Sequence, residues 1–174
     1  MPAYYTYLIS SLPMLNFPAL APFSLEVFFS KCKNLIPEDE FKILRSICCQ
    51  NSYALNVYGN LSLKQWVNFE ITLRNELARV RAARVKIDPA KFLRLPDVPQ
   101  AQISHVALAA YRCTAILEAE HILDQARWNF LDTLSLGHYF DFDYLLVYAL
   151  KLQILERWDK IQKADKEHLL NAVI

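Results

Sequence analysis

The chain has 174 residues, a formal net charge of +1 and only two glycines. This length suits one domain or two small lobes with a buried core. The near-zero net charge excludes a strong overall field that would recruit nucleic acid or an anionic membrane. The scarcity of glycine argues against glycine-rich phosphate loops and against a turn-rich β fold.

The first 25 residues carry no charge, yet they do not match a signal peptide or an anchor. The first lysine is Lys31, so a basic leading region is missing. Pro13, Pro18 and Pro22 would interrupt a membrane-spanning helix. We therefore expect a cytoplasmic protein. The segment 4–12 fits either a helix face or a strand face, so the pattern leaves its structure open.

Hydrophobic periodicity predicts helices along the rest of the N-terminal half. A helix over 24–34 begins with a serine that can cap it, and Pro37 precedes an acidic first turn of the next helix. Ser62 and Gln65 have the spacing of a capping box for a long helix that extends to residue 84.

The sequence LPDVP at residues 95–99 is the clearest break in the chain. Prolines at such positions end helices and favour extended or turn conformations. We therefore place a boundary between two helical lobes there. The predicted lobes comprise residues 1–95 and 100–174.

The stretch 116–161 predicts a helical hairpin on which the C-terminal lobe is built. Gly137 can end the first arm, and Asp141 or Asp143 can cap the second. The second arm has apolar residues on two sides, which is typical of a core helix. Trp128, Trp158, Leu152 and Leu155 lie on or beside these apolar faces and should be buried. The predicted fold class is an all-α helical bundle of about six to eight helices.

Glu118 and His121 have the Glu-x-x-His spacing that places a carboxylate and an imidazole on one helical face. Di-iron bundles use two such pairs, and the sequence contains only this one. We therefore assign no metal site and no cofactor. A metal-dependent enzyme that uses Glu118 and His121 is kept as an alternative.

A basic run extends from residue 74 to residue 94. Its members are Arg74, Arg79, Arg81, Arg84, Lys86, Lys91 and Arg94. They form no single helical stripe and no base-stacking aromatic residues interleave with them, which argues against nucleic acid. We expect an acidic protein partner instead, with Arg74, Arg79 and Arg81 as the candidate partner-binding residues.

Lys151 and Gln153 are polar residues in the middle of the predicted core helix. A buried lysine can act as a general base, but it more often pairs with a carboxylate or extends to the surface. We expect Lys151 to have a carboxylate partner, for which Asp124 and Glu120 on the other arm are candidates.

Several blocks of the sequence resemble an uncharacterised bacterial family associated with V/A-type ATPases. The hairpin carries EAEHILDQARW, GHYFDFD and YALKLQILERW, and the N-terminal half carries YYTYLISSLP and FEITLRNELARVRA. The helical pattern is more distantly similar to the all-helical socket of these ATPases, the component that joins the rotor axle to the membrane ring. This chain is much shorter than that socket.

The resemblance implies a non-catalytic structural or accessory subunit of a V/A-type ATPase that acts through protein–protein contacts. Its partners would be ATPase subunits, and it would reach the membrane only through the complex. The resemblance supplies no catalytic residue and no cofactor. Besides the metal-dependent enzyme, a helical adaptor unrelated to the ATPase is a further alternative.

Overall fold

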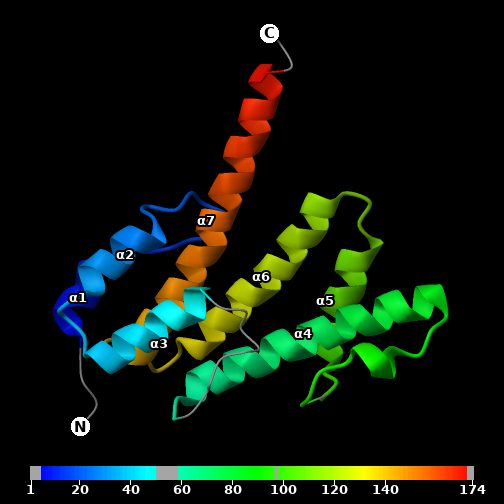
Figure 1. Ribbon diagram of the computed structural model, residues 1–174, viewed down its shortest axis with the longest axis horizontal. Coiled ribbons are helices and arrows are strands. Elements are labelled where there is room, and N and C mark those ends of the chain that lie inside the picture. Colours follow the sequence, from blue (N-terminus) through cyan, green and yellow to red (C-terminus); the bar gives the residue numbers. More distant parts are fainter. Residues whose placement is uncertain (1–4, 50–58, 97, 172–174) are drawn as a thin grey trace. The chain divides into compact units, whose positions relative to one another are not determined.

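The computed structural model is helical and describes residues 5–49, 59–96 and 98–171 (Figure 1). These ranges contain seven α-helices and one short 3-10 helix, and no strand occurs within them. The predicted all-α bundle is therefore confirmed. None of the helices in this part of the chain combines the length and apolar character needed to cross a bilayer.

The elements have the following bounds in chain order. They are α1 (Thr6–Ser10), α2 (Leu25–Cys32), α3 (Glu38–Cys49), α4 (Leu61–Val85), η2 (Pro89–Phe92), α5 (Ala101–Arg112), α6 (Ile116–Leu134) and α7 (Phe142–Asn171). The N-terminal segment that the pattern left open thus contains the short helix α1.

Helix ends follow the expected chemistry in most places. The Ser24 side chain accepts a hydrogen bond from the Val27 amide at the start of α2. At the start of α4, however, the cap is Asn60, whose Oδ1 accepts from the Leu63 amide at 2.7 Å. The predicted capping box at Ser62 is wrong because the helix begins one residue earlier, which places Ser62 inside its first turn.

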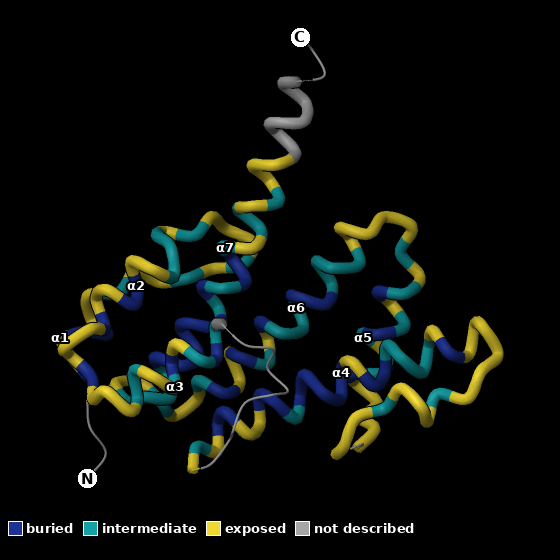
Figure 2. The backbone as a smooth tube through the Cα atoms, viewed as in Figure 1, coloured by how far each residue is buried: buried dark blue, intermediate teal, exposed yellow. Residues whose placement is uncertain are grey.

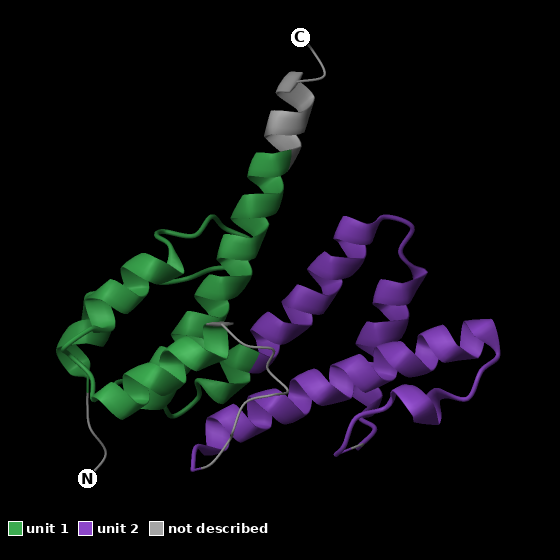
Figure 3. Cartoon of the chain, viewed as in Figure 1, with its two compact units in different colours: residues 1–49, 131–174 green, residues 50–130 purple. Residues whose placement is uncertain are grey.

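The chain divides into two compact units (Figure 3). Unit 1 comprises Met1–Cys49 and Leu131–Ile174, and unit 2 comprises Gln50–Phe130. This division differs from the predicted lobes 1–95 and 100–174. The reason is that helices pack across the break at 95–99: α4 packs on α5, whereas α2 and α3 pack on α7.

The core of unit 1 is the N-terminal half of α7 (Figure 2). Six consecutive residues of this helix, numbered 145–150, are buried, as are Leu152 and Leu155. A helix buried on all sides is packed on all sides, as the two apolar faces predicted. Trp158, in contrast, is only half-buried. Its ring meets Phe17 of the irregular N-terminal linker edge to face, with 6.4 Å between ring centroids.

The N-terminal segment of unit 1 lies against α7 through aromatic packing and hydrogen bonds. The Tyr148 ring stacks on Phe28 with 5.3 Å between ring centroids. Its hydroxyl donates a hydrogen bond to the Pro13 carbonyl at 2.9 Å. Gln153, one of the two polar residues in the core helix, donates from Nε2 to the Cys48 carbonyl at 3.0 Å.

Unit 2 combines aromatic packing with buried polar groups. The rings of Phe69 and Phe130 stack with centroids 4.2 Å apart, and Trp66 packs beside both. Trp128 is buried, as predicted. Glu76 of α4 is also buried, and its carboxylate accepts from Ser104 of α5 at 2.8 Å. Buried polar groups need such partners, so this contact fixes α5 against α4.

Candidate functional site: an arginine-bearing groove along α4

A groove in unit 2 is formed where the chain reverses direction after α4. Lys86 adopts the left-handed conformation (φ 58°) and ends the helix, and the Ile87 amide donates to the Ala82 carbonyl at 3.1 Å. Asp88 then caps η2 through the Ala90 amide. The segment 87–94 is thereby directed back along α4, with which η2 is in contact.

Asn75 fastens this returning segment to α4. Its Nδ2 donates to the Arg94 carbonyl at 2.8 Å, and its Oδ1 accepts from the Arg94 amide at 2.9 Å. The Asn75 side chain is completely buried. One amide side chain therefore satisfies both backbone groups of one residue and sets the position of the second wall of the groove.

The space between these walls has a volume of about 460 Å³. This value lies within the range of about 300–1,000 Å³ that is typical of ligand pockets. The lining residues come from α4, the returning segment and α6. They are Glu70, Leu73, Arg74, Leu77, Ala78, Arg81, Ala82, Val85, Ile87, Phe92 and Arg127.

The lining combines exposed apolar side chains with exposed arginines. Val85, Ile87 and Phe92 have 66%, 47% and 54% of their surface exposed. Arg74 and Arg81 are exposed as well. An apolar cavity with a few charged groups at its edge is the usual composition of a binding site.

Arg127, at the α6 end of the groove, has a structural role. Its Nε donates to Glu70 at 2.8 Å, and its Nη1 donates to the fully buried Asp124 at 2.9 Å. Burial opposes the charge of this guanidinium, but the two carboxylates outweigh it and raise the Arg127 pKa. The three groups form a compensated buried cluster that holds α6 on α4.

The three candidate partner-binding residues occupy different places. Arg74 and Arg81 line the groove, two helical turns apart on the same face of α4. Arg79 is absent from the lining, and its Nη1 donates to the buried Glu76 at 2.5 Å. The structure therefore brings two of the three together around one cavity.

Sequence reasoning did not identify the apolar members of this site. A signal was available, because Arg74, Leu77, Ala78, Arg81 and Val85 recur at helical spacing. Ile87 and Phe92 were not recognised, because their place follows from the chain reversal and not from a periodic pattern. A smaller cavity of about 220 Å³ adjoins the groove and shares Leu77 and Arg81 with it.

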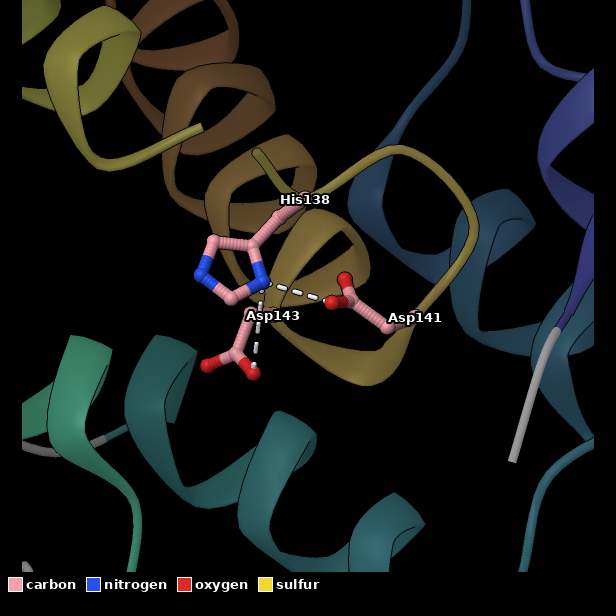
Figure 4. Close-up of side chains that lie close together, drawn as sticks. All are labelled: His138, Asp141 and Asp143. Carbon is pink, nitrogen blue, oxygen red and sulfur yellow. Dashed lines mark hydrogen bonds and ion pairs between the residues drawn. The ribbon is translucent and has the colours of Figure 1, made fainter. Parts of the chain in front are cut away.

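A second cluster, in unit 1, lies between α6 and α7 (Figure 4). His138 Nδ1 is 2.5 Å from an Asp141 oxygen and 3.8 Å from an Asp143 oxygen. The other Asp141 oxygen accepts from the Tyr144 amide at 3.1 Å, so Asp141 is the cap of α7. The hydrogen bond from His138 comes first among the causes that raise its pKa, with burial opposing and both carboxylates adding.

These three side chains are the one group of possible metal ligands found among the described residues. One imidazole and two carboxylates could hold a divalent metal ion such as zinc. Glu118 and His121 are not part of this group; Glu118 is exposed and His121 is half-buried on α6. The geometry at His138 is also explained without a metal, because it orders the turn before α7.

Lys151 has the carboxylate partner that the sequence predicted, but a different one. Its Nζ donates to Asp132 Oδ1 at 2.5 Å. Asp124 was a candidate partner, yet it binds Arg127. The charge of Lys151 in the core helix is therefore compensated at the edge of the core.

Comparison with known proteins gives one partial match. Residues 94–174, a little under half of the chain, are similar to a family described as "Protein of unknown function (DUF2764)". No curated protein and no solved structure matches the chain. The matched region includes the hairpin and Arg127, whereas the α4 side of the groove lies outside it.

Proposed function

We propose that this chain is a non-catalytic structural or accessory subunit of a V/A-type, ion-translocating rotary ATPase, and that it acts through protein–protein contacts. The groove along α4 is the observation that carries the protein-contact part of this proposal. It offers an apolar cavity and exposed arginines, the combination that is found at the centre and rim of protein interfaces.

The ATPase part of the proposal is supported by the resemblance of the blocks in the hairpin and in the N-terminal half. The hairpin blocks, residues 118–128, 137–143 and 148–158, all fall within the region matched by the family model. That family's description assigns no function. In the proposed role the chain is cytoplasmic and reaches the membrane only as part of the complex.

The test is affinity purification of the tagged chain from its own cells under conditions in which the ATPase is shown to be expressed. We expect ATPase subunits to co-purify without added nucleotide, because the proposed contact is structural. The tagged chain carrying Arg84→Glu is a suitable control, since Arg84 is exposed on α4 but does not line the groove. Recovery of the chain without ATPase subunits would contradict the proposal.

The enzyme alternative makes a separate prediction about metal content. A metal-dependent enzyme that uses Glu118 and His121 should retain a metal through gentle purification and lose it in the Glu118→Ala variant. Elemental analysis of both proteins distinguishes this alternative from a binding role. Recovery of partners other than ATPase subunits would instead favour the unrelated helical adaptor.

A further inference from the structure

From the geometry of the groove we infer that its occupant is an acidic amphipathic helix of a partner protein, whose carboxylates meet Arg74 and Arg81 and whose apolar side chains fill the cavity between them. This inference rests on the proposed function, since it names the kind of partner segment that the protein–protein contact uses. The recognition mode is a helix held in an apolar groove.

The spacing of the charges fits a helix. Arg74 and Arg81 are seven residues apart on α4, which corresponds to about 10 Å along the helix axis. Carboxylates at positions i and i+7 of a partner helix have the same separation. A partner helix that lies along α4 can therefore pair both charges at once.

The space between the two arginines fits apolar side chains. Leu77 and Ala78 lie between them on the same face of α4. The small side chain of Ala78 leaves room for a larger partner residue, and the exposed Ile87 and Phe92 form the opposite wall. Apolar residues at i+3 or i+4 of the partner helix would enter this cavity.

The surrounding charge favours an acidic occupant. Seven basic residues lie between positions 74 and 94, and the two acidic residues of this stretch are Glu76 and Asp88. Glu76 is buried against Arg79, and Asp88 caps η2. The exposed surface beside the groove is thus positive, which attracts acidic partners and rejects basic ones.

A protein helix fits this site better than a lipid surface or a nucleic acid. Lipid surfaces bind apolar side chains that project outward, whereas Leu77, Ala78 and Ala82 line a concave space. Single-stranded nucleic acids stack their bases on aromatic side chains, and Phe92 is the one aromatic residue in the lining.

The test is an unbiased selection of helical peptides from a displayed random library on the purified full-length chain. We expect the selected peptides to carry Asp or Glu seven residues apart, with apolar residues between them. Selected peptides are then synthesised with a fluorescent label, and binding is measured by anisotropy at low and high salt. Weaker binding at high salt is expected, because the charged contacts are screened.

Three variants separate the contributions of charge and cavity. Arg81→Glu reverses a charge in the groove, and Ala78→Trp fills the cavity; each should weaken peptide binding by about tenfold or more. Arg84→Glu makes the same charge change on α4 outside the lining, and it should change binding by less than about twofold. Circular dichroism on each variant verifies that the helical fold is retained.

Several outcomes would overturn the inference. These are a selection that yields no binder or basic peptides, equal losses in Arg81→Glu and Arg84→Glu, or full binding to Ala78→Trp. Binding of phosphatidylglycerol vesicles or single-stranded DNA that needs Ala78 and Arg81, without peptide binding, would assign the groove to a lipid or nucleic acid.

The two proposals fail in different ways. If ATPase subunits co-purify equally with the wild-type chain and with Arg81→Glu and Ala78→Trp, the accessory role stands and the groove inference fails. If acidic peptides bind as expected but no ATPase subunit is recovered from cells, the groove inference stands and the ATPase assignment fails.

Discussion

The Asn75 side chain forms two hydrogen bonds with the backbone of Arg94, nineteen residues further along the chain. These bonds hold the returning segment beside α4 and so create the second wall of the groove. Because Asn75 is completely buried, water cannot easily replace it. The groove therefore depends on one amide that is not itself part of its lining.

Asn75→Ala should reduce the free energy of unfolding by about 1–3 kcal/mol, because both polar groups of Arg94 lose their partner. The matched control is Asn129→Ala on α6, where the asparagine is exposed and bonded to Gln125. The control should lie within about 0.5 kcal/mol of the wild type. Urea denaturation measures both, and equal effects of the two variants would refute the role of Asn75.

Leu152→Ala should reduce the free energy of unfolding by about 2–5 kcal/mol, because the side chain is fully buried in the core helix α7. Leu136→Ala removes the same atoms from a side chain that is 73% exposed, so it should have little effect. Chemical denaturation compares the two. A small loss for Leu152→Ala would mean that this face of α7 is not tightly packed.

The ion pair between Lys151 and Asp132 should contribute little to stability, because the Asp132 side chain is 55% exposed. Lys151→Met keeps the buried stem and should cost less than about 1 kcal/mol. Lys151→Ala should cost more, since it also removes the packing of that stem. A double-mutant cycle with Asp132→Asn measures the coupling, and a value well above about 1 kcal/mol would contradict the expectation.

The His138 cluster should make the stability of unit 1 depend on pH. The folded-state pKa of His138 is raised, chiefly by its hydrogen bond to Asp141. The protonated histidine therefore adds stability that is fully present below the unfolded-state pKa of about 6.5 and is lost as the pH rises through the folded-state value. The wild type should thus exceed His138→Ala in stability by more at about pH 5.5 than at about pH 9.

Asp141→Asn provides the control for this prediction. It removes the carboxylate but leaves an oxygen that can still cap α7 through the Tyr144 amide. The His138 pKa, measured by NMR titration, should then fall towards its ordinary range. An unchanged His138 pKa in this variant would show that Asp141 is not the cause of the shift.

The sequence predicted those features that depend on local pattern. The apolar residues on both sides of 142–161 identified the core helix, and the short polar residues Ser24 and Asp141 marked helix starts correctly. The cap of α4 was misassigned because Asn60 and Ser62 both have capping side chains, and spacing alone favoured the serine. Local pattern fixes an element more reliably than its first residue.

The features that the sequence did not predict depend on which faces meet. Lys151 was matched with Asp124 or Glu120, but its partner is Asp132, because periodicity gives a side chain's face and not the register between two helices. Similarly, the basic run suggested Arg74, Arg79 and Arg81 as equivalent residues. The structure separates Arg79 because Glu76, three residues earlier, binds it.

The two units differ in the order in which their parts leave the ribosome. Unit 2 is a continuous stretch, Gln50–Phe130, so all of its helices are available for packing before α7 has been synthesised. Unit 1 consists of two stretches, and Phe28 and Leu44, both fully buried in the finished fold, must wait for the second stretch. During synthesis the N-terminal helices therefore present apolar surface while the groove-bearing unit can already form, which makes α2 and α3 the segments most in need of protection by chaperones.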